Sequence, residues 1–165
     1  MNLFSSWVLS LLCLVSSTWA QSPPPSPAKK PIDAVSLAKI SMKGDIKPGA
    51  SVTAVVQFKI EPGYHVQANP TSEPNLIPAV LKLDPAAGLV WSPPTYPAAK
   101  EEKVAGLDKP LKVYDGSFEI LVPIQIAADA KLPISIAGVL SYQACKGAVC
   151  YAPKRLKLEI PVAGK

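Results

Sequence analysis

The sequence predicts an all-β domain, an immunoglobulin-like antiparallel β-sandwich. Apolar and polar residues alternate in four runs, at residues 52–60, 118–126, 132–142 and 156–162. Such alternation is typical of strands that bury one face and expose the other. Turn signals separate the runs, and no stretch carries a long amphipathic helical stripe. We expect roughly seven to nine short strands in about 130 residues, which fits a sandwich of this type.

The first twenty residues predict a secretory signal peptide. Residues 1–20 hold no charged side chain, and a short apolar core at residues 8–15 precedes Thr18, Trp19 and Ala20. Thr18 and Ala20 place small residues at positions −3 and −1 of a cleavage site that follows Ala20. The core is far shorter than the about 20 apolar residues that span a bilayer. We expect cleavage after Ala20, export to the periplasm or further, and no transmembrane segment in the mature chain.

Residues 21–32 are predicted to be a disordered, proline-rich linker, and residues 33–165 a single domain. Five of the eleven residues from Gln21 to Pro31 are proline, which favours an extended segment. The domain that follows is long enough to bury a core of its own. The net charge of +5 comes from basic residues spread along the chain. Because they form no block with interleaved aromatic residues, we expect no nucleic-acid partner.

Two parts of the domain depart from simple alternation. Pro123, Pro133 and Pro161 fall within or beside the apolar runs. Because proline cannot donate to a strand ladder, we place them at strand ends or on edge strands. Residues 92–110 are rich in proline and lysine and do not alternate. We expect a long surface loop there, of the kind that often carries function.

Cys145 and Cys150 are the only cysteines that remain once residues 1–20 are removed. If residues 132–144 and 151–162 are adjacent antiparallel strands, residues 146–149 form the connecting loop and the two cysteines face each other. Facing residues have Cα atoms about 4.5–5.5 Å apart, which is within the reach of a disulfide. The spacing therefore allows a Cys145–Cys150 disulfide without movement of the backbone.

A disulfide across so short a loop suits redox chemistry better than stapling the fold. Closing about six residues stabilises by roughly 2 kcal/mol, against roughly 3 kcal/mol for fifteen residues. Lys146 follows Cys145 directly, and its charge favours the thiolate if the two side chains approach. The alternative stays open: a non-catalytic immunoglobulin-like binding or assembly module whose hairpin disulfide is structural.

His65 is the only histidine of the chain. A blue-copper site needs two histidines and a cysteine, and a structural zinc site needs four ligands, so neither is complete here. A Cys–His nucleophile would pair His65 with one cysteine, but the second cysteine favours a disulfide in an exported protein. We expect no metal and no cofactor, and we place His65 as a partly exposed residue beside the hairpin.

The cysteine hairpin also carries a family resemblance. Its sequence is Tyr142-Gln143-Ala144-Cys145, four further residues, and then Cys150-Tyr151-Ala152-Pro153. Upstream segments follow in a matching order: Pro62-Gly63-Tyr64-His65-Val66, Asn69-Pro70, Leu76-Ile77-Pro78, Gly88-Leu89-Val90-Trp91 and Val113-Tyr114-Asp115-Gly116. Over residues 35–162 the chain resembles the N-terminal periplasmic domain of the thiol:disulfide interchange protein DsbD.

This resemblance implies a protein-disulfide reductase with an immunoglobulin-like fold and a redox-active disulfide. In the family, a thioredoxin-like domain fed from a membrane-embedded partner reduces the two cysteines. They pass the electrons to periplasmic disulfide isomerases or to thioredoxins of cytochrome maturation. This chain has neither a membrane-spanning electron-transfer segment nor a Cys-x-x-Cys domain. We therefore expect its thioredoxin-like partners and its membrane-embedded electron donor to be separate chains.

The resemblance also implies roles for single residues. Cys150 forms the mixed disulfide with a partner, Cys145 resolves it, and Tyr96 in the segment 92–97 is the aromatic lid of a cap loop over the sulfurs. The other expected residues of the site are Tyr64, His65, Lys146, Tyr142 and Tyr151.

Two details depart from the family pattern. The spacing of the cysteines is one residue shorter than in the best-known member, which affects the geometry of the hairpin loop. Acidic residues near the cap of that member have no clear match, because Glu101 and Glu102 are displaced along the loop.

Overall fold

The computed structural model describes residues 32–104, 106 and 108–164, and their regular secondary structure is entirely β-strand. The predicted signal peptide and residues 21–31 of the predicted linker lie outside the described residues. The strands are β1 (Val35–Lys43), β2 (Ser51–Ile60), β3 (His65–Gln67), β4 (Val80–Leu83), β5 (Leu89–Trp91), β6 (Lys100–Glu102), β7 (Leu111–Asp115), β8 (Ser117–Ile126), β9 (Ile134–Tyr142), β10 (Ala144–Lys146), β11 (Val149–Cys150) and β12 (Lys154–Val162). No helix in this part of the chain has the length and hydrophobicity to cross a membrane.

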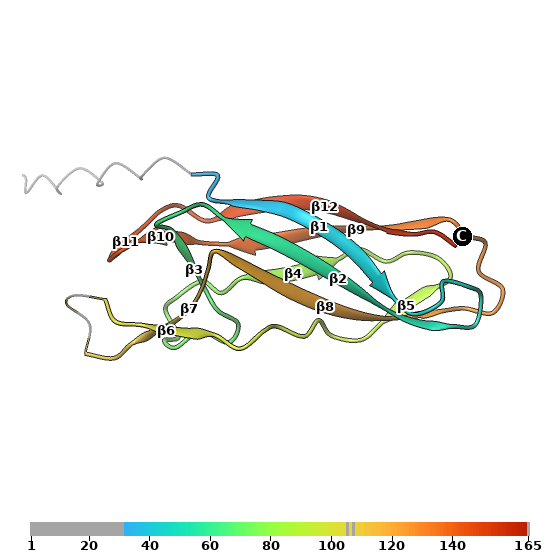
Figure 1. Cartoon of the computed structure of the whole chain (residues 1–165), viewed down its shortest axis with the longest axis horizontal. Helices are drawn as coiled ribbons and strands as arrows, with labels where there is room; N and C mark the ends of the chain where they lie inside the picture. Colours follow the sequence, from blue (N-terminus) through green and yellow to red (C-terminus); the bar gives the residue numbers. More distant parts are fainter. Residues whose placement is uncertain (1–31, 105, 107, 165) are drawn as a thin grey trace, which may run out of the picture.

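Three antiparallel sheets build the immunoglobulin-like sandwich (Figure 1). The first sheet has the strand order β1-β2-β8-β5, the second β11-β10-β3-β7-β6, and the third β12-β9-β4. The main core joins their inner faces, with Phe58, Ile120, Ile136 and Ile160 fully buried. Burying such a side chain stabilises the fold by about 1.5–3 kcal/mol, so this core holds the domain together.

The four predicted runs correspond to β2, β8, β9 and β12, four of the five strands of nine or ten residues. The fifth, β1, was not predicted, because this edge strand does not alternate between buried and exposed residues. Exposed and buried residues alternate along β8, and β9 pairs with β12 from Tyr142 opposite Lys154 to Ile134 opposite Val162. The described residues form twelve strands, more than expected, and five of these are only two or three residues long. So short a strand cannot show an alternating pattern, which explains why the sequence did not reveal them.

The cysteine hairpin crosses from one sheet to another. Only Gln143 separates β9, which pairs with β12 and β4, from β10, which pairs with β3 and β11. At the crossing, Gln143 Nε2 donates to the carbonyl oxygen of Tyr151 at 3.0 Å and ties the two arms of the hairpin. The cysteines therefore lie in the second sheet, although the strands that lead to them belong to the third.

Pro123 does not lie where we expected it. It occupies the middle of β8, an inner strand between β2 and β5. Its carbonyl oxygen accepts from Ser92 N at 3.1 Å, so its ring nitrogen also faces Ser92, an exposed residue just after β5. Water can replace the missing ladder bond there. Pro133 precedes β9 and Pro161 lies in the edge strand β12, as predicted.

The segment 92–110 is not simply a loop. Thr95 forms an isolated bridge with Leu121 of β8, and residues 100–102 form β6, which pairs with β7 at the edge of the second sheet. The three residues of β6 are all charged, so no apolar pattern marked them as a strand. This edge strand brings its charged side chains next to β3 and β7.

The two ends of the described chain lie at opposite ends of the sandwich (Figure 1). Val35, at the start of β1, pairs with Ile60, close to the end of the molecule that carries β10 and β11. Val162, near the C-terminus, pairs with Ile134 at the far end. The cysteine hairpin is therefore near the N-terminal end of the described chain and distant from the C-terminal end.

Gly138 provides a test of the packing between β4, β9 and β12. A methyl group at this buried position would lie 2.7 Å from Leu83 Cδ2 and 3.2 Å from the carbonyl oxygen of Lys82. We expect Gly138→Ala to lower the free energy of unfolding by about 1–3 kcal/mol, because overpacking displaces the strands. Ser135→Ala, at an exposed position of β9, should change it by less than about 0.5 kcal/mol. Urea unfolding measures both, and equal stability of the two variants would show that Leu83 moves aside at no cost.

Candidate functional site

Cys145 of β10 and Cys150 of β11 form a disulfide, which confirms the expectation from their spacing. Their Cα atoms are 4.0 Å apart, slightly closer than the about 4.5 Å of a typical facing pair without ladder bonds. The backbone hydrogen bond is formed by the neighbouring pair, Ala144 and Tyr151, since Tyr151 N donates to the carbonyl oxygen of Ala144 at 2.9 Å. The cysteines thus occupy the kind of position at which facing side chains approach most closely.

The hairpin turn is tighter than predicted. Lys146 pairs with Val149, so only Gly147 and Ala148 connect the strands, instead of residues 146–149. Gly147 has a φ of 55°, a left-handed conformation that suits glycine in a two-residue hairpin turn. Val149 is 40% exposed beside this turn, so an apolar side chain is accessible at the tip of the hairpin.

The disulfide lies on the outer face of the second sheet. Cys145 faces His65 of β3, and His65 faces Asp115 of β7. Facing side chains of antiparallel strands lie on the same face of a sheet. One residue along, Val66 and Ala144 belong to the main core on the other face. The sulfurs and the imidazole therefore share the face that points away from the main core.

A second, smaller apolar cluster covers part of this outer face. It comes from β7 and from the segments before β4 and after β6, and consists of Leu76, Val104, Leu111 and Val113. With this cover, the polar side chain of Gln67 is fully buried although it points away from the main core. The outer face of the second sheet is thus a partly enclosed environment and not an open surface.

The two cysteine residues differ in their exposure to solvent. Cys145 is completely buried, whereas Cys150 is partly exposed. The side-chain amide of Gln67 donates from Nε2 to Cys145 Sγ at 3.7 Å. Cys150 is therefore the cysteine that lies nearer to solvent, and Cys145 is enclosed by protein atoms.

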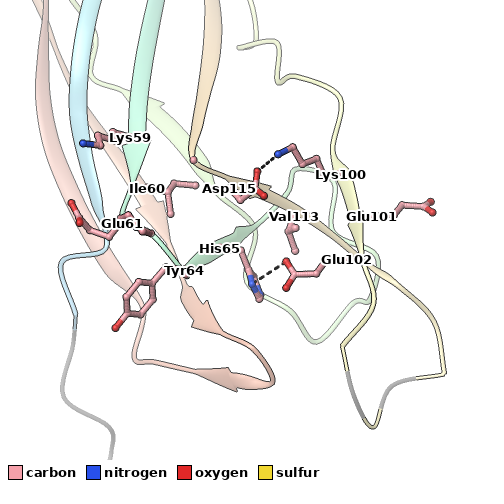
Figure 2. A pocket seen from close by; sticks show the side chains of 13 residues that line it. Lys59, Ile60, Glu61, Tyr64, His65, Lys100, Glu101, Glu102, Val113 and Asp115 are labelled. Atoms are coloured by element: carbon pink, nitrogen blue, oxygen red, sulfur yellow. Dashed lines mark hydrogen bonds and ion pairs between the residues drawn. The ribbon is translucent and has the colours of Figure 1, made fainter.

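His65 is buried, with 3% of its surface exposed, so the expectation of a partly exposed residue is wrong. Glu102 of the edge strand β6 lies against it, and this strand was not evident from the sequence. His65 Nδ1 lies 3.2 Å from Glu102 Oε2, and Figure 2 shows the two side chains pointing toward one another. His65 Nε2 is buried and has no hydrogen-bond partner among the described residues. Beside them, Lys100 forms an ion pair with Asp115.

A cavity of about 600 Å³ opens next to this histidine (Figure 2). The end of β2, the turn at residues 61–64, β6 and β7 line it, and its charged side chains include Glu61, Lys100, Glu102 and Asp115. The side chain of Glu102 is 39% exposed. The cavity therefore gives solvent access to the carboxylate that holds His65, whereas neither cysteine lines it.

Tyr64, Lys146 and Tyr151 lie on the face opposite to the disulfide. The ammonium group of Lys146 is 5.6 Å from the centre of the Tyr64 ring, and this ring is 5.9 Å from that of Tyr151. Desolvation and the nearby Tyr151 hydroxyl raise the pKa of Tyr64, so its hydroxyl is protonated at neutral pH. Consecutive strand residues point to opposite faces, so the approach of Lys146 to Cys145 that we considered does not occur.

Tyr142 and Tyr96 belong to the main core and not to the surface around the sulfurs. Tyr142 is 2% exposed. The Tyr96 hydroxyl accepts a hydrogen bond from Leu81 N at 3.0 Å, and the Tyr96 ring packs against the main core. The sulfurs lie on the other side of the second sheet. The lid role of Tyr96 stays a prediction, and in this arrangement it would require the bond to Leu81 to open.

Comparison with known proteins assigns the family. Residues 34–160 match the family described as "Thiol:disulfide interchange protein DsbD, N-terminal". The chain belongs to this family. The resemblance inferred from the cysteine hairpin is thus confirmed, and thiol–disulfide interchange is the chemistry of the DsbD N-terminal family. A search of curated proteins finds no match.

Three solved structures are similar to this DsbD-type domain. The reduced N-terminal domain of Neisseria meningitidis DsbD is 24% identical, with a TM-score of 0.45, over 76% of this chain and 86% of that one. The N-terminal periplasmic domain of Proteus mirabilis ScsB is 16% identical, with a TM-score of 0.50, over 79% of this chain and 47% of that one. A complex of the DsbD and PilB N-terminal domains of Neisseria meningitidis matches at 22% identity and a TM-score of 0.43, over 85% and 91%.

Removing the disulfide should leave the domain folded. Because the bridge closes a loop of about six residues beside a complete core, we expect the double variant Cys145→Ala, Cys150→Ala to lose roughly 2 kcal/mol or less. Thermal unfolding of this variant, compared with the oxidised and the reduced original protein, measures the loss. A double variant that is unfolded at room temperature would identify the disulfide as a structural staple.

Tyr96→Phe should lower the free energy of unfolding by about 1 kcal/mol, because Leu81 N loses its hydrogen-bond acceptor. Urea unfolding of the variant measures this effect, and an unchanged midpoint would exclude a stabilising role of the bond.

The lid role of Tyr96 needs a different variant. Faster reduction of the disulfide by glutathione in Tyr96→Ala would support the lid, and an unchanged rate would restrict Tyr96 to its contact with β4.

Proposed function

We propose that the chain is an exported thiol–disulfide interchange protein that passes reducing equivalents through Cys145 and Cys150 to partner proteins. The observation that carries this proposal is the unequal exposure of the two cysteine residues, with Cys145 fully buried and Cys150 partly exposed. A purely structural bridge needs no such asymmetry. An exchange reaction needs this asymmetry, because the partner must bind to one sulfur while the other stays protected within bonding distance of it.

The proposed reaction runs in two steps. In the reduced protein, the thiolate of Cys150 attacks a partner disulfide, one partner sulfur leaves as a thiolate, and a mixed disulfide forms. The thiolate of Cys145 then attacks Cys150 Sγ, and the second partner sulfur leaves. The partner gains two electrons and two protons, and the Cys145–Cys150 bond is restored. A dithiol donor reduces this bond again by the reverse sequence.

Thioredoxin-like proteins are the partners that we propose, with a membrane-embedded electron donor on a separate chain. The accessible tip of the hairpin, with Val149 beside the turn, supports docking of a protein surface next to Cys150. The predicted signal peptide supports export to the periplasm, and the similar ScsB domain is described as periplasmic.

Single-cysteine variants test the proposed roles. A lone thiol cannot resolve a mixed disulfide, so Cys145→Ala should accumulate a covalent complex with an oxidised thioredoxin-like protein. Cys150→Ala should accumulate little, because Cys145 is buried. Non-reducing gels and mass spectrometry of both variants measure the complexes. The reverse pattern would exchange the roles of the two cysteines. No complex with either variant would instead favour a non-catalytic binding module.

A further inference from the structure

We propose that His65 is the general acid and base for the buried sulfur of Cys145, and that Glu102 positions His65 and links it to solvent. This inference rests on the proposed interchange function and adds the path by which its proton moves. It assigns a task to two residues that the two-cysteine chemistry does not use.

The need for such a path follows from the burial of Cys145. During interchange its sulfur is in turn part of a disulfide, a thiolate and a thiol, so it must lose and regain a proton. No surface of Cys145 is exposed to water. The amide of Gln67, 3.7 Å from the sulfur, can donate a hydrogen bond but cannot give up a proton at neutral pH. A titratable group within the protein is therefore required.

His65 is placed to serve as that group. It faces Cys145 across the pairing of β3 with β10, on the same face of the sheet. Its Nδ1 is engaged by Glu102 Oε2 at 3.2 Å, which leaves Nε2 as the nitrogen that can exchange a proton. A nucleophile, a base and a third group that orients the base form the arrangement that activates thiols and hydroxyls in other proteins.

Two unpartnered atoms support the same assignment. His65 Nε2 and Gln67 Oε1 are buried without hydrogen-bond partners, and buried polar atoms in this state are uncommon because they cost free energy. Both residues lie on the outer face of β3, the face that carries Cys145. The disulfide has no hydrogen to donate to them. A thiol at Cys145 has one, so reduction supplies a donor for one of these two atoms.

Glu102 completes the route to solvent. Its side chain is 39% exposed and lines the cavity of about 600 Å³ together with His65. The cavity beside His65 is also lined by Asp115, which is paired with Lys100, and by the charged residues Lys59, Glu61 and Glu101. Because Asp115 already has a cationic partner, Glu102 is the carboxylate in contact with the imidazole.

The proton step balances in both directions. When a donor thiolate attacks Cys150 Sγ, the S–S bond breaks and Cys145 leaves with the electron pair. The imidazolium of His65 gives its Nε2 proton to this thiolate, and the neutral imidazole keeps its Nδ1 proton toward Glu102. When the protein reduces a partner, Nε2 takes the proton of the Cys145 thiol, and the resulting thiolate attacks Cys150 Sγ of the mixed disulfide.

Reduction by dithiothreitol tests this inference without a protein partner. The rate is followed from pH 5 to 9 by acid quenching, alkylation and mass spectrometry, and is divided by the thiolate fraction of the reductant. In the original protein the corrected rate should be highest at low pH and fall as the imidazolium loses its proton. His65→Gln should remove this dependence and lower the rate at pH 6 by about tenfold, below the 10²–10⁴ of typical general acid catalysis, because thiolates leave readily.

Glu102→Gln and Glu101→Gln form a matched pair of controls. They remove the same charge from adjacent residues of β6. Both residues line the cavity, but Glu101 pairs with Lys112 and its side chain points away from His65 (Figure 2). In Glu102→Gln the pH profile should change and the corrected rate at pH 6 should fall, because the imidazole loses the carboxylate that orients it. Glu101→Gln should behave like the original protein. Because Glu102 is partly exposed, its variant keeps the test decisive even if His65→Gln does not fold.

Two results would overturn the inference. The first is a pH profile of His65→Gln that equals that of the original protein. The second is an equal change of the pH profile in Glu102→Gln and Glu101→Gln. Failure of the proposed function would look different. In that case Cys145→Ala would trap no thioredoxin-like protein, while the dependence on His65 in the dithiothreitol reaction would persist.

Discussion

The register of β10 is the constraint on which the whole site depends. It places Cys145 opposite Cys150 on one side and opposite His65 on the other. A shift by one residue would turn the sulfur toward the main core and bring Ala144 or Lys146 to the outer face, because strand side chains alternate. The crossing at Gln143, the tight turn and the burial of Ala144 all hold this register.

The main elements of the fold could be predicted because the long strands have two unlike faces. Alternation marked β2, β8, β9 and β12, and the hairpin spacing led to the facing cysteines. Short elements could not be predicted in the same way. β3, β6 and β11 have two or three residues, too few for a period of two to be recognised. Their positions depend on pairing with strands that are distant in the sequence.

The surroundings of the sulfurs were less predictable than the sulfurs themselves. The contact of Glu102 with His65 joins an edge strand of charged residues to a strand more than thirty positions earlier, and no local pattern encodes such an encounter. The orientation of Lys146 was different, since alternation alone predicts that it points away from Cys145. A charged neighbour in the sequence is therefore weak support for an effect on a strand cysteine.

The placement of the chain ends has a practical consequence for work with this domain. Asp33 forms an ion pair with Lys154, which lies at the start of β12 near the hairpin. Val162 lies at the other end of the same strand. An affinity tag, a fluorescent protein or a surface attachment fused directly before Asp33 would crowd the approach to Cys150. The same group fused after the last strand would leave the sulfurs free to meet another protein. Binding and kinetic experiments are therefore better designed with attachment at the C-terminus.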